Sequence, residues 1–96
     1  MTKSLPPVHP GEVLKEEFMG PLGLSANALA RAIRVPANRI SAIVNADRSI
    51  TADTALRLAK ALGTTPDFWL NLQKQYDLDH ARDEAKDLAR IEPIRA

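Results

Sequence analysis

Residues 24 to 48, LSANALARAIRVPANRISAIVNADR, limit what this chain can fold into more than any other stretch. They contain two short segments with apolar residues at helical spacing, separated by a turn of very few residues. Pro36 suits the first position of the second helix, because its fixed φ is already helical. Two helices in this relation commonly present the second one to the major groove of DNA. The stretch therefore predicts a helix-turn-helix unit.

Chain length and composition restrict the class of protein. The 96 residues leave room for one domain with a modest core. The absence of cysteine excludes disulfides and thiolate metal sites, and favours a reducing compartment. No apolar run has the length of a signal peptide or a membrane span. We expect one cytoplasmic domain over residues 1–96, with a core at about 8–78 and a C-terminal helical extension at about 79–92.

Charge is unevenly distributed along the chain, although the net charge is only +1. Residues 31–60 contain six bases and two acids, which gives this segment a net charge of +4. From residue 63 onward five bases face seven acids, which gives −2. A basic middle and an acidic C-terminal part suggest two surfaces with different partners.

Helix signals predict an all-α chain of five helices without strands. Ser25, Thr51 and Thr65 are good N-cap residues, and Gly63 suits a helix end. His9 is expected to start the first helix, and Gly20-Pro21 to stop it. The helices are predicted at about residues 10–19, 26–33, 36–45, 52–62 and from 66 to beyond 90.

The helix predicted at 36–45 has the composition of a base-reading helix. With about 100° between successive residues, Ile40, Ile43 and Val44 share one face and point to the core. The opposite face is short and polar, and asparagine and arginine can pair in bidentate fashion with adenine and guanine. Its members are Asn38, Ala42 and Asn45, flanked by Arg39 and Ser41.

The neighbouring segments offer contacts to the phosphate backbone. Ser25 and the free amides at the start of the 26–33 helix could hold a phosphate, and Asn27 lies on the outward face of that helix. Arg48, just past the base-reading helix, is placed to reach the strand beyond the groove.

The last helix outruns what a small four-helix core can cover. A first apolar stripe includes Phe68, and a second has the 3-4-3 spacing of a coiled-coil seam. We therefore predict that part of this helix forms a homodimer interface. The predicted interface residues are Trp69, Leu72, Tyr76, Leu78, Ala81, Ala85 and Leu88.

Residues 22–78, which include the FWLNLQ and YDL stretches, and the HPGEVLKEEF start resemble the HigA (VapI-like) antitoxins of bacterial toxin–antitoxin modules. These belong to the phage-repressor-like helix-turn-helix proteins, with a lambda-repressor-like domain. The similarity covers about Val8 to Leu78. It implies a five-helix domain, a homodimer, a palindromic double-stranded DNA operator and a small RelE-like (HigB-like) ribonuclease toxin as partner. The implied function is to neutralise the toxin and repress the shared operon.

The resemblance also implies which residues contact DNA, and where this chain departs from its relatives. Arg34 stands where many relatives have glycine in the turn, so a left-handed backbone is expected there at some cost. Ala46-Asp47 replaces a glycine-containing turn, and Ala26 replaces a frequent polar contact residue. The implied contacts are Ser25, Asn27, Ala37, Asn38, Arg39, Ala42, Asn45 and Arg48.

Other functions stay open on the sequence alone. The charge of Asp47 and the turn at Arg34 favour a protein-binding module with an idle helix-turn-helix, and a stand-alone regulator without a toxin is a further alternative. An enzyme is not expected, because His9 and His80 lack obvious catalytic neighbours and the acids of the last helix alternate with bases. No glycine-rich phosphate loop is present. We expect no cofactor, no metal and no membrane partner.

Overall fold

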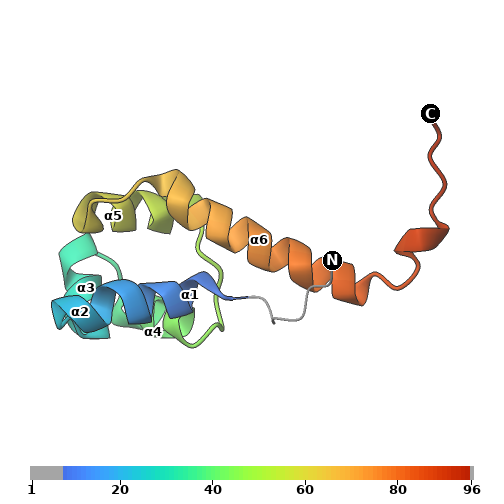
Figure 1. The fold of residues 1–96 in the computed structure, drawn as a ribbon. Helices are drawn as coiled ribbons and strands as arrows, with labels where there is room; N and C mark the ends of the chain where they lie inside the picture. The colour runs from blue at the N-terminus through green and yellow to red at the C-terminus, as the bar shows by residue number, and fades with distance from the viewer. Residues whose placement is uncertain (1–7, 96) are drawn as a thin grey trace.

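Helices make up nearly all the regular structure in the computed structural model, which describes residues 8–95 and has no strand in that range (Figure 1). The helix-turn-helix predicted from the sequence is formed by α3 and α4. In chain order the elements are α1 (Pro10–Val13), the π-helix η1 (Leu14–Met19), α2 (Gly20–Leu22), α3 (Ala26–Ile33), α4 (Ala37–Val44), α5 (Ala52–Leu62), α6 (Pro66–Glu84) and the 3-10 turn η2 (Leu88–Arg90).

Side-chain caps set the start of three helices as predicted. The hydroxyl oxygens of Ser25, Thr51 and Thr65 accept the backbone N–H three residues later, at 3.0, 3.4 and 3.1 Å. Each cap satisfies one of the backbone donors that a helix start leaves unpaired. Gly63 adopts a left-handed conformation (φ 74°) and ends α5. The bounds of α3 and α5 therefore match the sequence prediction.

Gly20-Pro21 does not end the first helix, which corrects the sequence prediction. The chain stays helical through η1 and α2 to Leu22, and the left-handed Gly23 (φ 65°) ends it. A proline ring normally clashes with the carbonyl four residues earlier. Here the π-helix ends at Met19, just before Gly20-Pro21, and the amide of Gly20 bonds to the carbonyl of Lys15, five residues back. The wider turn accommodates the proline without breaking the helix.

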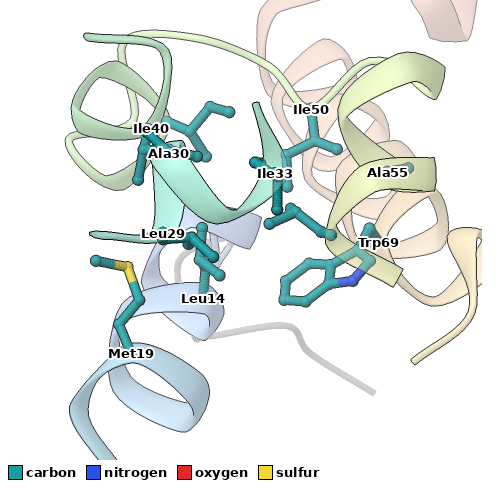
Figure 2. Close-up of a cluster of buried hydrophobic side chains, with 11 residues drawn as sticks. Leu14, Met19, Leu29, Ala30, Ile33, Ile40, Ile50, Ala55 and Trp69 are labelled. Carbon is teal, nitrogen blue, oxygen red and sulfur yellow. The ribbon is translucent and has the colours of Figure 1, made fainter. Parts of the chain in front are cut away.

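The core lies where α1, η1, α3, α4, α5 and α6 meet. Figure 2 shows Leu14, Leu29 and Ile33 directed into the same interior as the Trp69 ring. These side chains are 5% exposed or less, and the Trp69 indole N–H donates to the Thr64 hydroxyl at 2.7 Å. Burying such side chains stabilises a fold by roughly 1.5–3 kcal/mol each. The large aliphatic residues and one indole therefore form a single core.

Helix α6 starts beside α5 and then leaves the bundle, so its C-terminal half and the residues after it project from the body (Figure 1). The described chain accordingly measures 50 × 27 × 22 Å. The helix ends at Glu84, with only a 3-10 turn at Leu88–Arg90, so the prediction of a helix continuing past Arg90 is wrong. Little tertiary packing reaches this segment in one subunit, and most helical stability in proteins comes from such packing. No helix within residues 8–95 is long and apolar enough to cross a membrane.

Candidate nucleic-acid interface

The outward face of α4 is open to solvent, as the sequence predicted. Ile40 and Ile43 are fully buried, and Val44 packs partly against the core. On the opposite side Asn38, Ser41 and Asn45 are exposed. The helix begins at Ala37 rather than Pro36, because Pro36 has the extended backbone of an N-cap (ψ 145°). Ala37 and Ala42 are half-buried, and their small side chains allow a partner to approach the helix backbone closely.

The start of α3 presents a second polar surface. Ser25 is exposed while its hydroxyl caps the helix, and Asn27, two residues later, is exposed as well. Leu29 and Ile33 fix the helix to the core on its other side. The N-terminal amides and the positive end of the helix dipole make this surface suited to an anion such as a phosphate.

Two non-glycine residues adopt left-handed backbone conformations on either side of α4. Arg34 has φ 64° at the end of α3, and Ala46 has φ 64° after α4. Both turns are still closed by backbone bonds, from Val35 to the carbonyl of Ala30 (3.0 Å) and from Asp47 to that of Ala42 (2.8 Å). The turn geometry expected at Arg34 is therefore present, at a cost of roughly 1–2 kcal/mol for a residue with a side chain.

Arg39 is bound within the subunit, and this differs from its predicted base-reading role. Its Nη1 donates to Asp53 Oδ2 on α5 at 3.0 Å, and its Nε is buried without a hydrogen-bond partner. Arg57 shares the same carboxylate and also donates to the carbonyl of Ile33 at 2.8 Å. The hydrogen bond from Arg57, aided by Arg39, lowers the pKa of Asp53 below its usual range, although Asp53 is exposed. In the free protein this network connects α4, α5 and the end of α3.

Sequence reasoning missed the contact that seats α4 against α1. A Cβ on Gly11 would overlap the carbonyl oxygen of Ile43, so only glycine allows this approach. His9 begins the helix, as predicted, by accepting the Gly11 N–H on its Nδ1 at 2.9 Å. The spacing between Gly11 and Ile43 is 32 residues, so no local pattern could have revealed the approach.

His9 also connects α1 to α6 and to the segment after α4. Its ring lies edge-on to Tyr76, with centroids 4.8 Å apart. Burial lowers the pKa of His9, while the charge of Asp77 and a hydrogen bond to the backbone of Arg48 act in the opposite direction. Since Nδ1 must be unprotonated to accept the Gly11 amide, the lowered pKa agrees with the capping role.

Gln73 is another buried polar residue that the sequence reading did not single out. It is 5% exposed, and its Oε1 accepts the backbone N–H of Ile50 at 2.7 Å. Its Nε2 donates to Asp77 at 3.0 Å. The residue therefore fixes the loop between α4 and α5 to α6, next to the exposed Arg48 and Asp47.

The residues predicted for a dimer interface fall into four groups. Trp69 is 0% exposed within its own subunit, so it belongs to the core and cannot contact a second copy, which corrects the prediction. Leu72 and Tyr76 are half-buried against the same body. Leu78 and Ala81 are exposed on the projecting part of α6, whereas Ala85 and Leu88 lie beyond the end of that helix, so the expected continuous seam is not formed.

Within residues 8–95 no group of three or more His, Cys, Asp or Glu side chains is arranged to hold a metal ion. The exposed polar faces of α3 and α4 and the net positive charge of residues 31–60 instead fit a polyanion. Fold and surface together define a helix-turn-helix protein.

Known proteins agree with this class. The family described as Helix-turn-helix matches residues 14–69. Virulence-associated protein I of Dichelobacter nodosus is 48% identical, over 94% of this chain and 83% of its own length. The addiction module antidote protein of the HigA family from Coxiella burnetii is 52% identical, with a TM-score of 0.87 over 93% of this chain and 99% of that one. The Pseudomonas aeruginosa antitoxin HigA, solved with the higBA promoter, is 41% identical, with a TM-score of 0.84 and the same coverage. The chain therefore belongs to the HigA family of helix-turn-helix antitoxins.

Proposed function

We propose that this protein binds double-stranded DNA by placing α4 in the major groove, and that it represses its own operon from a palindromic operator. The single observation that carries the proposal is the solvent-exposed polar face of α4. A relative covering most of the chain was solved with promoter DNA, which supports the same use of this fold. Two such helices in a dimer would address half-sites about one helical turn apart.

We assign direct base contact chiefly to Asn38 and Asn45, because an amide can pair in bidentate fashion with adenine. Ala37 and Ala42 allow close approach, and Ala42 can touch a thymine methyl group. The remaining predicted contacts go to the DNA backbone or flank the groove and fix the register of the protein. These are Ser25, Asn27, Ser41 and Arg48.

Arg39 has a different role in this proposal. Its guanidinium bonds to Asp53 in the free protein and holds α4 against α5. Contact with a guanine would require breaking that ion pair. We therefore treat Arg39 as a residue that positions the base-reading helix, and we expect Asp53→Ala, which breaks the same ion pair, to lower operator affinity about as much as Arg39→Ala does.

We further propose that the protein acts in the bacterial cytoplasm as a homodimeric antitoxin, which neutralises a small ribonuclease toxin by forming a complex with it. The antitoxin names of its relatives support this part. The protein acts here by binding, not by catalysis. Co-purification with the product of the neighbouring gene tests the antitoxin role. A chain that purifies alone from cells expressing both genes would indicate a stand-alone regulator.

A gel shift with the DNA upstream of the protein's own gene tests the repressor role. We expect specific binding that weakens steeply with salt, because phosphate contacts release counterions. Equal affinity for a scrambled fragment would refute specific repression.

The substitution Asn38→Ala tests the base contact. It should cost about 1–3 kcal/mol of operator affinity, the usual value of one bidentate pair, and leave binding to scrambled DNA unchanged. Asn71→Ala, an exposed asparagine on α6, is the matched control and should change neither. Unaltered operator affinity in Asn38→Ala would show that α4 does not read bases through this residue.

A further inference from the structure

The structure contains an apolar groove between the end of α3 and the outer face of α5, away from the polar face of α4. Its volume is about 420 Å³, and its apolar lining includes Ala32, Ala61 and the prominent Leu56, which is 59% exposed. Leu56 and the two alanines line a concave, mostly apolar surface, which is the shape that can receive an apolar side chain of a partner.

The groove is bordered by cations. Arg34 lies at one side, and Arg57 and Lys60 lie on α5. Of these three cations, Arg57 pairs with the carboxylate of Asp53, which also pairs with Arg39. The neighbourhood therefore keeps a net positive charge, which favours a partner with carboxylates around an apolar centre.

The projecting part of α6, residues 77–84, carries four acids and one base, a net charge opposite to that of the groove, and we call it the arm. Leu78 is 43% exposed, and Ala81 lies on the same side of the helix, within about 60° of it. Arg82 is the arm's cation, and it bonds to Asp79 at 3.2 Å. Measured from the middle of the Leu78–Ala81 ridge, Asp77 and Glu84 flank it on one side at about 70–90°, and Arg82 flanks it on the other at about 70°. Asp79 and Asp83 lie at about 130–170°, on the far side of the helix.

An arm cannot reach the groove of its own subunit. Helix α6 is continuous from Pro66, and at about 1.5 Å per residue Leu78 lies roughly 18 Å along the helix axis from its start beside α5 (Figure 1). Direct pairing of two arms would bring together two segments that each carry four acids and one base. Charge therefore disfavours an arm-to-arm seam and favours an arm in a cationic groove.

We propose that each arm inserts its Leu78–Ala81 ridge into the α3–α5 groove of a second copy of this chain, with the two copies exchanging arms around a two-fold axis. The proposal rests on the homodimer of the proposed function and names the surface that receives α6. Reciprocal insertion is self-complementary, so it closes at two subunits and does not form a filament. It follows the general mode in which an amphipathic helix lies in a hydrophobic groove.

Site-directed cross-linking tests the geometry directly, because the chain has no cysteine of its own. We expect a mixture of Leu56→Cys and Leu78→Cys proteins to form a disulfide-linked heterodimer. The control pair is Leu22→Cys with Leu78→Cys, since Leu22 is equally exposed (60%) but lies on α2. Efficient self-linking of Leu78→Cys would indicate an arm-to-arm seam and overturn the proposal, as would equal linking of the control pair.

Affinity measurements separate this proposal from the homodimer itself. We expect Leu56→Asp and Leu78→Asp each to weaken dimerisation at least about tenfold in analytical ultracentrifugation, whereas Leu22→Asp leaves it unchanged. All three positions are exposed, and circular dichroism verifies that the fold is retained. A wild-type chain that is monomeric at every concentration refutes the homodimer and this proposal together. If the wild-type chain is a dimer and Leu56→Asp leaves it intact, the homodimer stands and only the proposal that the groove receives the arm is refuted. The same conclusion follows if Leu56→Asp impairs toxin binding but not dimerisation.

Discussion

The body of the molecule, residues 9–76, and the segment beyond it treat the same kinds of side chain in opposite ways. In the body most leucine and isoleucine side chains and the tryptophan pack into a common core, and Leu14, Ile40 and Leu58 are fully buried. Beyond Tyr76 the large aliphatic residues are all at least 43% exposed: Leu78, Leu88, Ile91 and Ile94. Helical spacing of apolar residues therefore indicates a face to be covered, but not whether the same subunit covers it.

The difference also concerns what holds each region in place. In the body, helices are connected by buried contacts between residues far apart in sequence, such as Gln73 with Ile50 and Gly11 with Ile43. The arm has bonds only between residues three or four positions apart, such as Arg82 with Asp79 and Gln75 with Asp79. Such local pairs contribute a few tenths of a kcal/mol, so the arm depends on a partner for its packing.

The largest expected effect tests whether contacts within one subunit hold the body together. Gly11→Ala places a methyl group into the carbonyl of Ile43, and we expect it to lower the free energy of unfolding by about 3 kcal/mol. Denaturant unfolding measures this. At Gly20 the nearest atom to an added Cβ is 3.4 Å away, and Gly20→Ala should change stability by less than about 1 kcal/mol, since a better helix former is opposed by the proline that follows. Similar effects at the two glycines would contradict the close approach of α1 and α4.

A smaller effect is expected at His9, where the body meets α6. His9→Ala removes a helix cap and should cost about 1 kcal/mol at neutral pH, whereas His9→Asn keeps an acceptor at this position. Burial lowers the pKa of His9 in the folded protein below its ordinary value of 6.5. As the pH falls below 6.5, the unfolded chain therefore binds more protons than the folded protein does. Stability present above pH 6.5 is therefore lost as the pH falls through the lowered pKa.

The measurement is the free energy of unfolding between pH 7.5 and 5, two values chosen to bracket the ordinary histidine pKa of about 6.5. We expect His9→Asn to flatten this dependence relative to the wild-type chain. An identical pH profile in the variant would show that His9 does not contribute to it.

Substitutions in the left-handed turns flanking α4 are expected to stabilise the protein, in contrast to those at Gly11 and His9. Arg34→Gly and Ala46→Gly should each raise stability by about 0.5–1 kcal/mol, because glycine tolerates φ 64° without strain but loses more entropy on folding. Ala52→Gly, at the first position of α5 with ordinary helical geometry, is the control and should not stabilise. Thermal unfolding of the three variants measures these changes. A loss of stability in Arg34→Gly would mean that the Arg34 side chain stabilises the fold by more than its left-handed backbone destabilises it.

The smallest effect is expected beyond the arm. Ile94 is fully exposed, so Ile94→Ser should change the free energy of unfolding by less than about 0.5 kcal/mol in dilute solution. Ile40→Ser, in the core, should unfold the body under the same conditions. A clear destabilisation by Ile94→Ser in the monomer would remove the contrast between the two regions.

Sequence alone determined the local features of this protein. The bounds of α3 and α5 and the start of α6 were predictable because each cap is an interaction between a side chain and an amide three residues away. The buried face of α4 and the left-handed turn at Arg34 followed from helical periodicity and from the family's glycine at that position. These features depend on residues that are close in the chain, so their physical cause is visible in the sequence.

Only the tertiary structure decided the features that depend on distant residues. Arg39 meets Asp53 across 14 positions, and the sequence could not show that this cation is bound inside the subunit. The exclusion of Trp69 from any surface and the end of α6 at Glu84 likewise follow from which side chains the folded body covers. Burial and ion pairing are properties of neighbours in space, whereas capping and periodicity are properties of neighbours in the chain, and that difference separates what could be predicted from what could not.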